Sequence, residues 1–286
     1  MAKVFLDYDQ AALDRAYDQP SWAPNMQEVL QRRAAAADAV RTRLGEPRRF
    51  AYGSTPVEQL DVFAARPGAP VMVFLHGGAW RGGDARSQAF PAETFVRAGA
   101  HWVVPDFAAV TDVGLDGMVA QVRSAVAWVA RHAGDFGGDP GRIYVGGHSS
   151  GGHLAANVLV TDWAKDFGLP ADLVKGGLCV SGMYDLKAVR LSARSSYVKF
   201  DDRIEHELSP QRHLERLRAP VVVAYGERDS PEFQRQSREF AAALERVGRL
   251  RALLVGQGLN HFEIPETLAS ADGLLGRGAL TLMGLA

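Results

Sequence analysis

Residues 142–153 read RIYVGGHSSGGH, an apolar run that leads into two serines flanked by glycines and histidines. Within it, residues 147–151 fit the pattern G-x-S-x-G. The apolar run predicts a strand, and HLAANVLVTDW after it predicts a helix. A strand, a sharp turn and a helix in this order form a nucleophile elbow, whose glycines let a strained turn form without Cβ clashes. The register predicts Ser149 as the nucleophile and the Ser150 backbone N–H as an oxyanion donor.

Further apolar runs predict the sheet around this elbow. They are continuous rather than alternating in polarity, as expected of strands that are covered on both faces. The runs are PVMVFLH (70–76), HWVVPDF (101–107), RIYVGG (142–147), GGLCVSG (176–182), PVVVAYG (220–226) and RALLVG (251–256). Amphipathic helical stretches separate them, such as the valines at 119, 122, 126 and 129. This alternation predicts an α/β fold with a doubly wound, mostly parallel sheet flanked by helices, and an active site at the carboxyl ends of the strands.

The first 45 residues predict a helical extension of the same domain. Asn25, with Glu28 three residues later, predicts a capping box at the start of a helix that Gly45 ends. One face of this helix consists of Met26, Val29, Arg33, Val40 and Leu44. The extension has two open interpretations, a cover over the active site and a structural brace. Because no repeat or linker interrupts the chain, residues 1–286 are predicted to form a single domain.

The composition excludes several classes of protein. The chain of 286 residues is 47% hydrophobic and has a formal net charge of -1, so it offers no basic surface for nucleic acid or an anionic membrane. No window approaches the roughly 18 apolar residues of a membrane span, and the start lacks a signal-peptide pattern. We therefore expect a cytoplasmic location. Cys179 is the only cysteine, which excludes an internal disulfide and a cysteine-rich zinc site, and we expect no metal or other cofactor.

The serine of the elbow needs a base, because a hydroxyl at its ordinary pKa is a poor nucleophile. His148 and His153 are close to Ser149 in sequence, but neither is expected to be in a position to act as its base. His148 is expected to face away from Ser149 along the turn, and His153 to lie one turn into the helix, beneath the elbow. Both are expected to pack around the elbow. His261 in QGLNHF follows the last predicted strand and is the expected base.

An acid must orient that base. GERDS follows the strand at 220–226 and offers Asp229 as the acid, with Glu227 as an alternative and Asp185 in GMYDL as a more distant one. Serine, acid and histidine then follow in the order that α/β-hydrolases use. Each residue comes after a predicted strand, where an active site belongs.

An oxyanion hole is predicted in PVMVFLHGGAW. A buried strand ends at His76, and Gly77 shapes a loop that lets backbone N–H groups approach the substrate. This is the HGGG-type loop of lipases and esterases with Ala79 in the fourth place. The expected donors are the N–H groups of Gly78, Ala79 and Ser150.

These motifs resemble a known group of enzymes. The stretches HGGAW (76–80), GHSSGGHLAA, VSGMYDL and GERDSPEFQRQS are similar to those of hormone-sensitive-lipase-like esterases, and more closely to the kynurenine formamidase (arylformamidase) group of that superfamily. The N-terminal YDQAALDRAYDQ is similar to bacterial members. The resemblance implies the α/β-hydrolase fold and a cofactor-free serine hydrolase with the triad Ser149, Asp229 and His261. One departure is Asp106-Phe107-Ala108-Ala109, where relatives often carry a Tyr-x-Leu-Ala-Pro segment.

The resemblance implies hydrolysis of an aryl formamide such as N-formylkynurenine through an acyl-enzyme. The alternatives are a carboxylesterase for small acyl esters, acyl transfer to an alcohol, and a non-catalytic protein that binds small molecules. The expected partner is a small-molecule acyl substrate, and a homodimer stays open. Aromatic residues near predicted strand ends are expected to line the substrate pocket: Trp80, Phe107, Tyr184, Tyr197 and Phe262.

Overall fold

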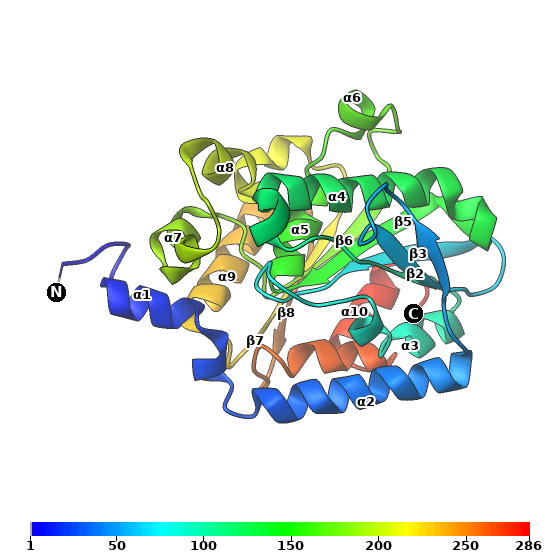
Figure 1. Cartoon of the computed structure of the whole chain (residues 1–286), viewed down its shortest axis with the longest axis horizontal. Coiled ribbons are helices and arrows are strands. Elements are labelled where there is room, and N and C mark those ends of the chain that lie inside the picture. The colour runs from blue at the N-terminus through cyan, green and yellow to red at the C-terminus, as the bar shows by residue number, and fades with distance from the viewer. Residues whose placement is uncertain (1) are drawn as a thin grey trace.

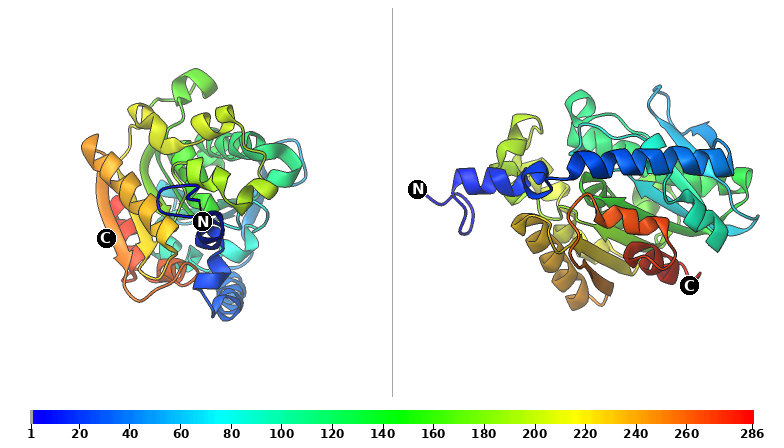
Figure 2. Two further views of the ribbon diagram at one scale, coloured as in Figure 1. Left: turned by 90° about the vertical axis from the view of Figure 1, so that its left-hand side faces the viewer. Right: turned by 90° about the horizontal axis from the view of Figure 1, so that it is seen from below.

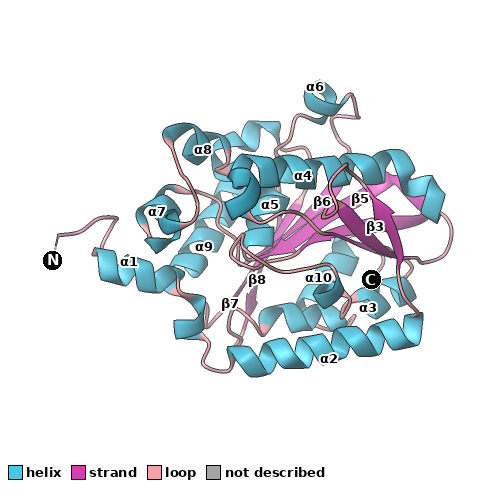
Figure 3. Cartoon of the chain, viewed as in Figure 1, coloured by secondary structure: helices cyan, strands magenta, loops and turns pink. Residues whose placement is uncertain are grey.

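The structure, a computed structural model, describes residues 2–286, in which a central sheet lies between layers of helices (Figure 1, Figure 3). Over these residues the sheet has eight strands in the order β1-β2-β4-β3-β5-β6-β7-β8. β2 pairs antiparallel with both β1 and β4, and all other neighbours pair parallel. The strands are β1 (Arg48–Ala51), β2 (Gln59–Phe63), β3 (Ala69–Leu75), β4 (His101–Pro105), β5 (Gly138–His148), β6 (Val174–Val180), β7 (Val221–Gly226) and β8 (Leu250–Gly256).

Helices connect most of these strands. The α-helices are α1 (Gln10–Tyr17), α2 (Met26–Leu44), α3 (Ala92–Ala98), α4 (Val110–His132), α5 (Ser150–Leu159), α6 (Trp163–Phe167), α7 (Lys187–Leu191), α8 (Asp202–Glu207), α9 (Pro231–Arg246) and α10 (Leu274–Leu282). The 3₁₀ helices are η1 (Gln19–Trp22), η2 (Arg86–Gln88), η3 (Ala133–Phe136), η4 (Ala193–Ser196), η5 (Pro210–Arg216) and η6 (Ile264–Ala269). Among residues 2–286, no helix combines the length and apolarity that crossing a membrane requires.

Alternate side chains of each central strand enter two different cores. In β3, Val71, Val73 and Leu75 belong to the core that includes α4, α5 and α9, whereas Met72 and Phe74 belong to the core that includes α2, α3 and α10. Every residue of β3 is buried for this reason. Coverage of both faces explains why the strands are continuous apolar runs in the sequence.

The predicted doubly wound, mostly parallel sheet is confirmed, and the six apolar runs correspond to β3 through β8. β1 and β2 extend the sheet beyond β4 as an antiparallel pair that the sequence analysis did not single out. β1 has only four residues and is largely exposed, so it lacks the apolar run of the central strands.

The predicted capping box at the start of α2 is wrong. Asn25 precedes the helix, but its side chain does not cap it. Instead, Asn25 Nδ2 donates to Glu263 Oε1 at 2.7 Å, and Asn25 Oδ1 accepts from Asn260 Nδ2 at 2.7 Å. A tertiary contact thus replaces the local one, and it ties the start of α2 to the loop after β8. Figure 2 shows α2 running along the body of the molecule from this point.

Candidate active site

Ser149 stands at the sharp turn between β5 and α5. Its backbone has φ 58° and ψ -124°, a conformation that residues with a side chain rarely adopt. The two glycines of the motif make the turn possible. A Cβ at Gly147 would lie 2.1 Å from the carbonyl oxygen of Gly151, and a Cβ at Gly151 would lie 2.0 Å from that of Leu75. The predicted elbow is therefore a strained turn packed too tightly for larger residues.

His261 reaches this serine from the loop after β8. Its Nε2 lies 2.9 Å from Ser149 Oγ, and its Nδ1 lies 3.3 Å from Asp229 Oδ1 in the loop after β7. Asp229 Oδ2 accepts hydrogen bonds from Ser181 Oγ at 2.6 Å and from the backbone N–H of Gly226 at 3.2 Å. His261 and Asp229 are each 2% exposed. The carboxyl ends of three strands thus bring together the three residues that the sequence analysis named.

The two other acids considered from the sequence are engaged elsewhere. Glu227 is exposed and accepts a hydrogen bond from the backbone N–H of Gly258 at 2.7 Å. Asp185 forms a bidentate ion pair with Arg212, whose Nε and Nη2 each lie 2.8 Å from a carboxylate oxygen of Asp185. Within residues 2–286, Asp229 is the only carboxylate within 4.0 Å of the His261 imidazole.

The two histidines near the elbow differ in their roles. His153 lies beneath it as expected, where its Nε2 is 2.8 Å from the Leu208 carbonyl oxygen and its ring meets Trp80 edge to face. His148 does not face away from the site, because its side chain lines the cavity above Ser149 and its ring lies 4.6 Å from that of His261. Burial, together with the nearby charges of His261 and Arg33, lowers the pKa of His148 well below its ordinary value. His148 is therefore held neutral beside the triad.

The loop after β3 approaches Ser149 closely. A Cβ at Gly77 would lie 3.1 Å from the Cβ of Ser149. Gly78, Ala79 and Trp80 have successive positive φ values of 132°, 55° and 60°. Within residues 2–286, the backbone N–H groups of Gly78, Ala79 and Ser150 have no backbone or side-chain acceptor. Free N–H groups on a tight loop next to a nucleophile are what an oxyanion hole requires.

Neighbouring segments hold this loop in its unusual conformation. The N–H groups of Arg81 and Gly82 donate to the Gly78 carbonyl oxygen at 2.9 and 3.2 Å. The ring of His76 stacks on that of Phe107 with centroids 4.1 Å apart and an interplanar angle of 7°. These hydrogen bonds and the stacked rings therefore stabilise the loop conformation.

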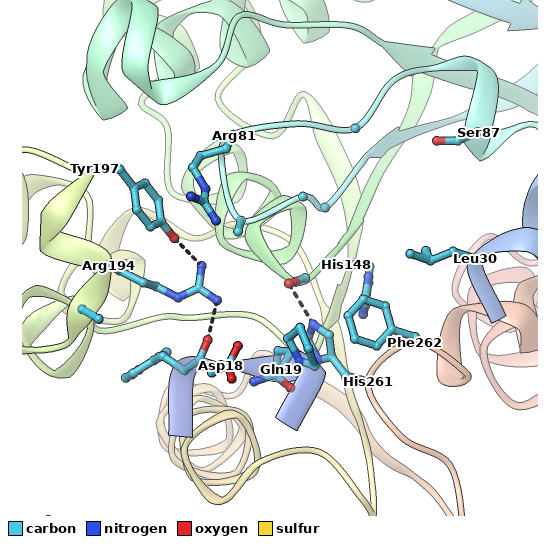
Figure 4. Close-up of a pocket in the computed structure, with 18 of the residues that line it drawn as sticks. Asp18, Gln19, Leu30, Arg81, Ser87, His148, Arg194, Tyr197, His261 and Phe262 are labelled. Carbon is cyan, nitrogen blue, oxygen red and sulfur yellow. Dashed lines mark hydrogen bonds between the residues drawn. The ribbon is translucent and has the colours of Figure 1, made fainter. Parts of the chain in front are cut away.

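A cavity of about 620 Å³ opens above the triad. Its walls come from the N-terminal segment, the loop after β3, the elbow, η4 with the residue after it, and the loop after β8 (Figure 4). The residues from the N-terminal segment are Asp14, Tyr17, Asp18, Gln19, Pro20, Leu30 and Arg33. Part of the N-terminal extension thus contributes to the cavity wall. Among residues 2–286, no group of three side chains is arranged to hold a metal ion.

Comparisons with known proteins identify the family of this chain. Residues 60–244 match the BD-FAE family model. The chain belongs to the BD-FAE family of α/β-hydrolases. It is 30% identical to a kynurenine formamidase from Danio rerio over 95% of this chain and 96% of that one. It is 30% identical to the esterase LipC of Mycobacterium tuberculosis over 76% of this chain and 58% of that one. A crystal structure of a thioesterase, itself assigned only provisionally, from Silicibacter sp. TM1040 superposes with a TM-score of 0.83 at 24% identity and covers 93% of this chain and 97% of that one.

In this BD-FAE family member, the aromatic residues differ from the expected pocket walls. Phe262 and Tyr197 line the cavity, but Trp80, Phe107 and Tyr184 do not. Trp80 is 1% exposed, and its ring packs edge to face against that of His153 beneath the elbow. Phe107 stacks on the loop histidine, and Tyr184 is fully buried against Phe240 with ring centroids 4.0 Å apart. A position after a strand end was therefore not sufficient to place a side chain in the pocket.

The N-terminal segment that lines the cavity, the cover, is fastened to α9 and η4. Tyr17 is 4% exposed, and its hydroxyl donates to Glu232 Oε2 at 2.9 Å. Burial and the charge of Glu232 raise the pKa of Tyr17 well above its ordinary value, so the hydroxyl stays a donor. Gln19 Nε2 donates to Ser230 Oγ at 3.2 Å, and Arg194 Nη2 donates to the Tyr17 carbonyl oxygen at 3.0 Å. The sequence carried no signal for these contacts beyond the N-terminal YDQAALDRAYDQ stretch.

Proposed function

We propose that the chain is a cofactor-independent serine hydrolase that cleaves aryl formamides, with N-formylkynurenine as the model substrate. The observation that carries the proposal is the contact chain from Ser149 through His261 to Asp229 beneath a covered cavity. A serine activated by a buried histidine and carboxylate is suited to acyl transfer through a covalent intermediate.

The proposed reaction uses each residue of the triad. His261 Nε2 accepts the Ser149 proton while Oγ attacks the formyl carbon, and the N–H groups of Gly78, Ala79 and Ser150 bind the oxyanion. The imidazolium then donates its proton to the departing amine nitrogen, and the C–N bond breaks. Water attacks the formyl ester, gives a proton to His261, and releases formate as the proton returns to Ser149. Asp229 orients the imidazole and stabilises its charged form.

Similarity to the Danio rerio kynurenine formamidase supports a formamide substrate. That similarity covers 95% of this chain, so it includes most of the N-terminal segment that covers the cavity. Similarity to the esterase LipC covers 76% of this chain. The formamidase comparison thus spans more of this chain than the esterase comparison does.

A carboxylesterase acting on small acyl esters is the second candidate, because the LipC similarity reaches the same 30% identity. The same triad would cleave a C–O bond. The cytoplasmic location and the homodimer expected from the sequence stay predictions.

Kinetics on two substrates test the proposal. We expect a higher kcat/KM for N-formylkynurenine than for a p-nitrophenyl ester, and loss of both activities by roughly 10⁴-fold or more in Ser149→Ala. Ser54→Ala is the matched control, since Ser54 is exposed and its hydroxyl forms no hydrogen bond within residues 2–286. If the ester is turned over and N-formylkynurenine is not, the carboxylesterase proposal replaces the formamidase proposal. Full activity of Ser149→Ala, or absence of labelling of the wild type by a fluorophosphonate probe, would contradict a serine hydrolase.

A further inference from the structure

Within residues 2–286, the three arginines of the cavity wall have no carboxylate within 4.0 Å, and two of them, Arg81 and Arg194, both contact Tyr197. Arg81 follows the oxyanion loop, and Arg194 belongs to η4. Both line the cavity that also contains Ser149 and His261. Figure 4 shows Arg81, Arg194 and Tyr197 together on one side of His261, with Leu30 and Phe262 on the other side. Within residues 2–286, neither arginine has a carboxylate within 4.0 Å, although most other arginines of the chain do.

Arg194 is buried and held in one orientation. The residue is 7% exposed. Its Nη1 donates to the hydroxyl of Tyr197 at 2.9 Å, and its Nη2 donates to the carbonyl oxygen of Tyr17 at 3.0 Å. Its guanidinium carbon lies 5.7 Å from the ring centre of Trp80 and 5.8 Å from that of Tyr17. The buried Nε has no partner within the described residues. These contacts orient the guanidinium but leave its charge unneutralised, which is costly in a buried position.

Arg81 contacts the ring of the same tyrosine, Tyr197. Its guanidinium carbon is 4.2 Å from the centre of the Tyr197 ring, and its side chain forms no hydrogen bond with residues 2–286. The tyrosine therefore contacts Arg81 through its ring and Arg194 through its hydroxyl. Two guanidinium groups gathered around one tyrosine repel each other, and an anion between them would remove that repulsion.

Other charged groups of the cavity are already engaged. Asp14 accepts hydrogen bonds from the Ala193 backbone N–H at 2.6 Å and from Gln10 Nε2 at 2.9 Å, and so joins α1 to η4. Asp18 accepts from the hydroxyl of Ser21. These carboxylates moderate the positive potential without pairing with either arginine.

Arg33, the third arginine of the cavity, differs from this pair. It hydrogen-bonds to Gln88 Oε1 at 3.3 Å, stacks over Phe90 and is influenced by the charge of Glu266, while burial lowers its pKa to about 10. It stands alone, whereas Arg81 and Arg194 flank one tyrosine.

We propose that Arg81 and Arg194 form an anion subsite that binds a carboxylate on the substrate. This inference rests on the proposed function, because a formyl group carries no side chain and any charged group must belong to the arylamine. The substrate class is thus an aryl formamide whose leaving group carries a carboxylate. Guanidinium groups match carboxylates in geometry and form two parallel hydrogen bonds with them. Arg81 also links the subsite to the oxyanion loop, two residues after Ala79.

The test uses two matched pairs of substrates. One pair is an aryl formamide with a carboxylate side chain and the same molecule with a carboxamide in its place. The second pair is the aryl acetates with the same two side chains. We expect wild-type kcat/KM to favour the carboxylate by about 10- to 100-fold in each pair, the range for one or two charged hydrogen bonds. In Arg81→Gln/Arg194→Gln, we expect the preference to fall to about 3-fold or less, because the loss falls mainly on the carboxylate member of each pair.

Single variants and a control separate recognition from folding. Arg81→Gln removes no hydrogen bond to the protein, and Arg194→Lys keeps the positive charge, so we expect the first to lose part of the preference and the second to retain part. Arg246→Gln changes the charge equally at an exposed position of α9 and should leave the preference intact.

Two results would overturn the subsite: no carboxylate preference in the wild type, or an equal loss for both members of a pair in the variants. If neither formamide is cleaved while the acetates keep the carboxylate preference, the formamidase proposal fails and the subsite stands.

Discussion

The edge of the sheet that carries the triad and the cover above it are built in different ways. At the edge, Ser149, Asp229 and His261 each lie within a few residues of a strand end, and the order of the strands brings them together. The cover combines residues 14–33 with residues 193–197, which meet only through long-range contacts. In the proposed reaction the edge supplies the chemistry, whereas the cover lines the cavity, so we expect substitutions in the two regions to affect different kinetic constants.

The two regions also differ in backbone strain. Ser149 and Ala79 have positive φ values without being glycine, and conformations of this kind cost about 1–3 kcal/mol each. At Ser149 the turn is held by its backbone N–H, which donates to the Val180 carbonyl oxygen at the end of β6 at 2.9 Å. The cover instead depends on single hydrogen bonds such as that from Tyr17 to Glu232. Loss of one such bond should loosen the cover while leaving the edge in place.

The largest effect is expected at the acid of the triad. Asp229→Asn should lower kcat on a p-nitrophenyl ester by roughly 10⁴-fold, because the amide can no longer hold the imidazole in the tautomer that accepts the serine proton. Glu227→Gln, two residues away and exposed, is the matched control and should stay within about 3-fold of the wild type. A larger loss in Glu227→Gln than in Asp229→Asn would exchange the roles of the two acids.

A smaller but still large effect is expected at the oxyanion loop. Gly78 has φ 132°, and a Cβ there would lie 2.0 Å from the carbonyl oxygen of Gly82, so the loop of Gly78→Ala must move. We expect kcat to fall by roughly 10²- to 10³-fold, as for loss of an oxyanion donor. Gly82→Ala is a close control, because a Cβ at Gly82 would meet no atom within 4 Å. Equal losses in both variants would mean that the loop tolerates no substitution at all, and that the N–H of Gly78 has no special role.

The same contrast explains what the sequence could predict. The apolar runs predicted β3 through β8, and the motifs after them named the residues that the structure brings together, because strand ends and sharp turns are local features. Trp80 and Tyr184 were misplaced because side-chain direction after a strand depends on the loop backbone, which the motif does not encode. Arg81 and Arg194 were missed because no local pattern marks an arginine without an acidic partner.

Asn25 illustrates the same limit within the cover. Its spacing to Glu28 fits a capping box, but its side chain bonds to Asn260 and Glu263 on either side of His261 in the sequence. A partner more than two hundred residues away competes successfully with the local one. Such competition is invisible until the fold brings the two segments together.

The smallest effect, and the sharpest test of the contrast, is expected at Tyr17. Tyr17→Phe removes the hydrogen bond to Glu232 and leaves that buried carboxylate to its ion pair with Arg235. We expect about 1–2 kcal/mol lower stability by denaturant unfolding and a KM for a large aryl formamide raised by up to about 10-fold. The kcat for a small p-nitrophenyl ester should be unchanged, since that substrate needs little of the cover.

Tyr8→Phe is the control for this prediction, because the Tyr8 hydroxyl forms no hydrogen bond within residues 2–286 and lies outside the cavity. If Tyr17→Phe lowered kcat on both substrates equally, the cover would have to act on the triad itself. That result would contradict the proposal that the edge performs the chemistry and the cover selects the substrate. If KM rises for the large substrate and not for the small ester, the cover must contact the part of the large substrate that lies away from the reacting atoms.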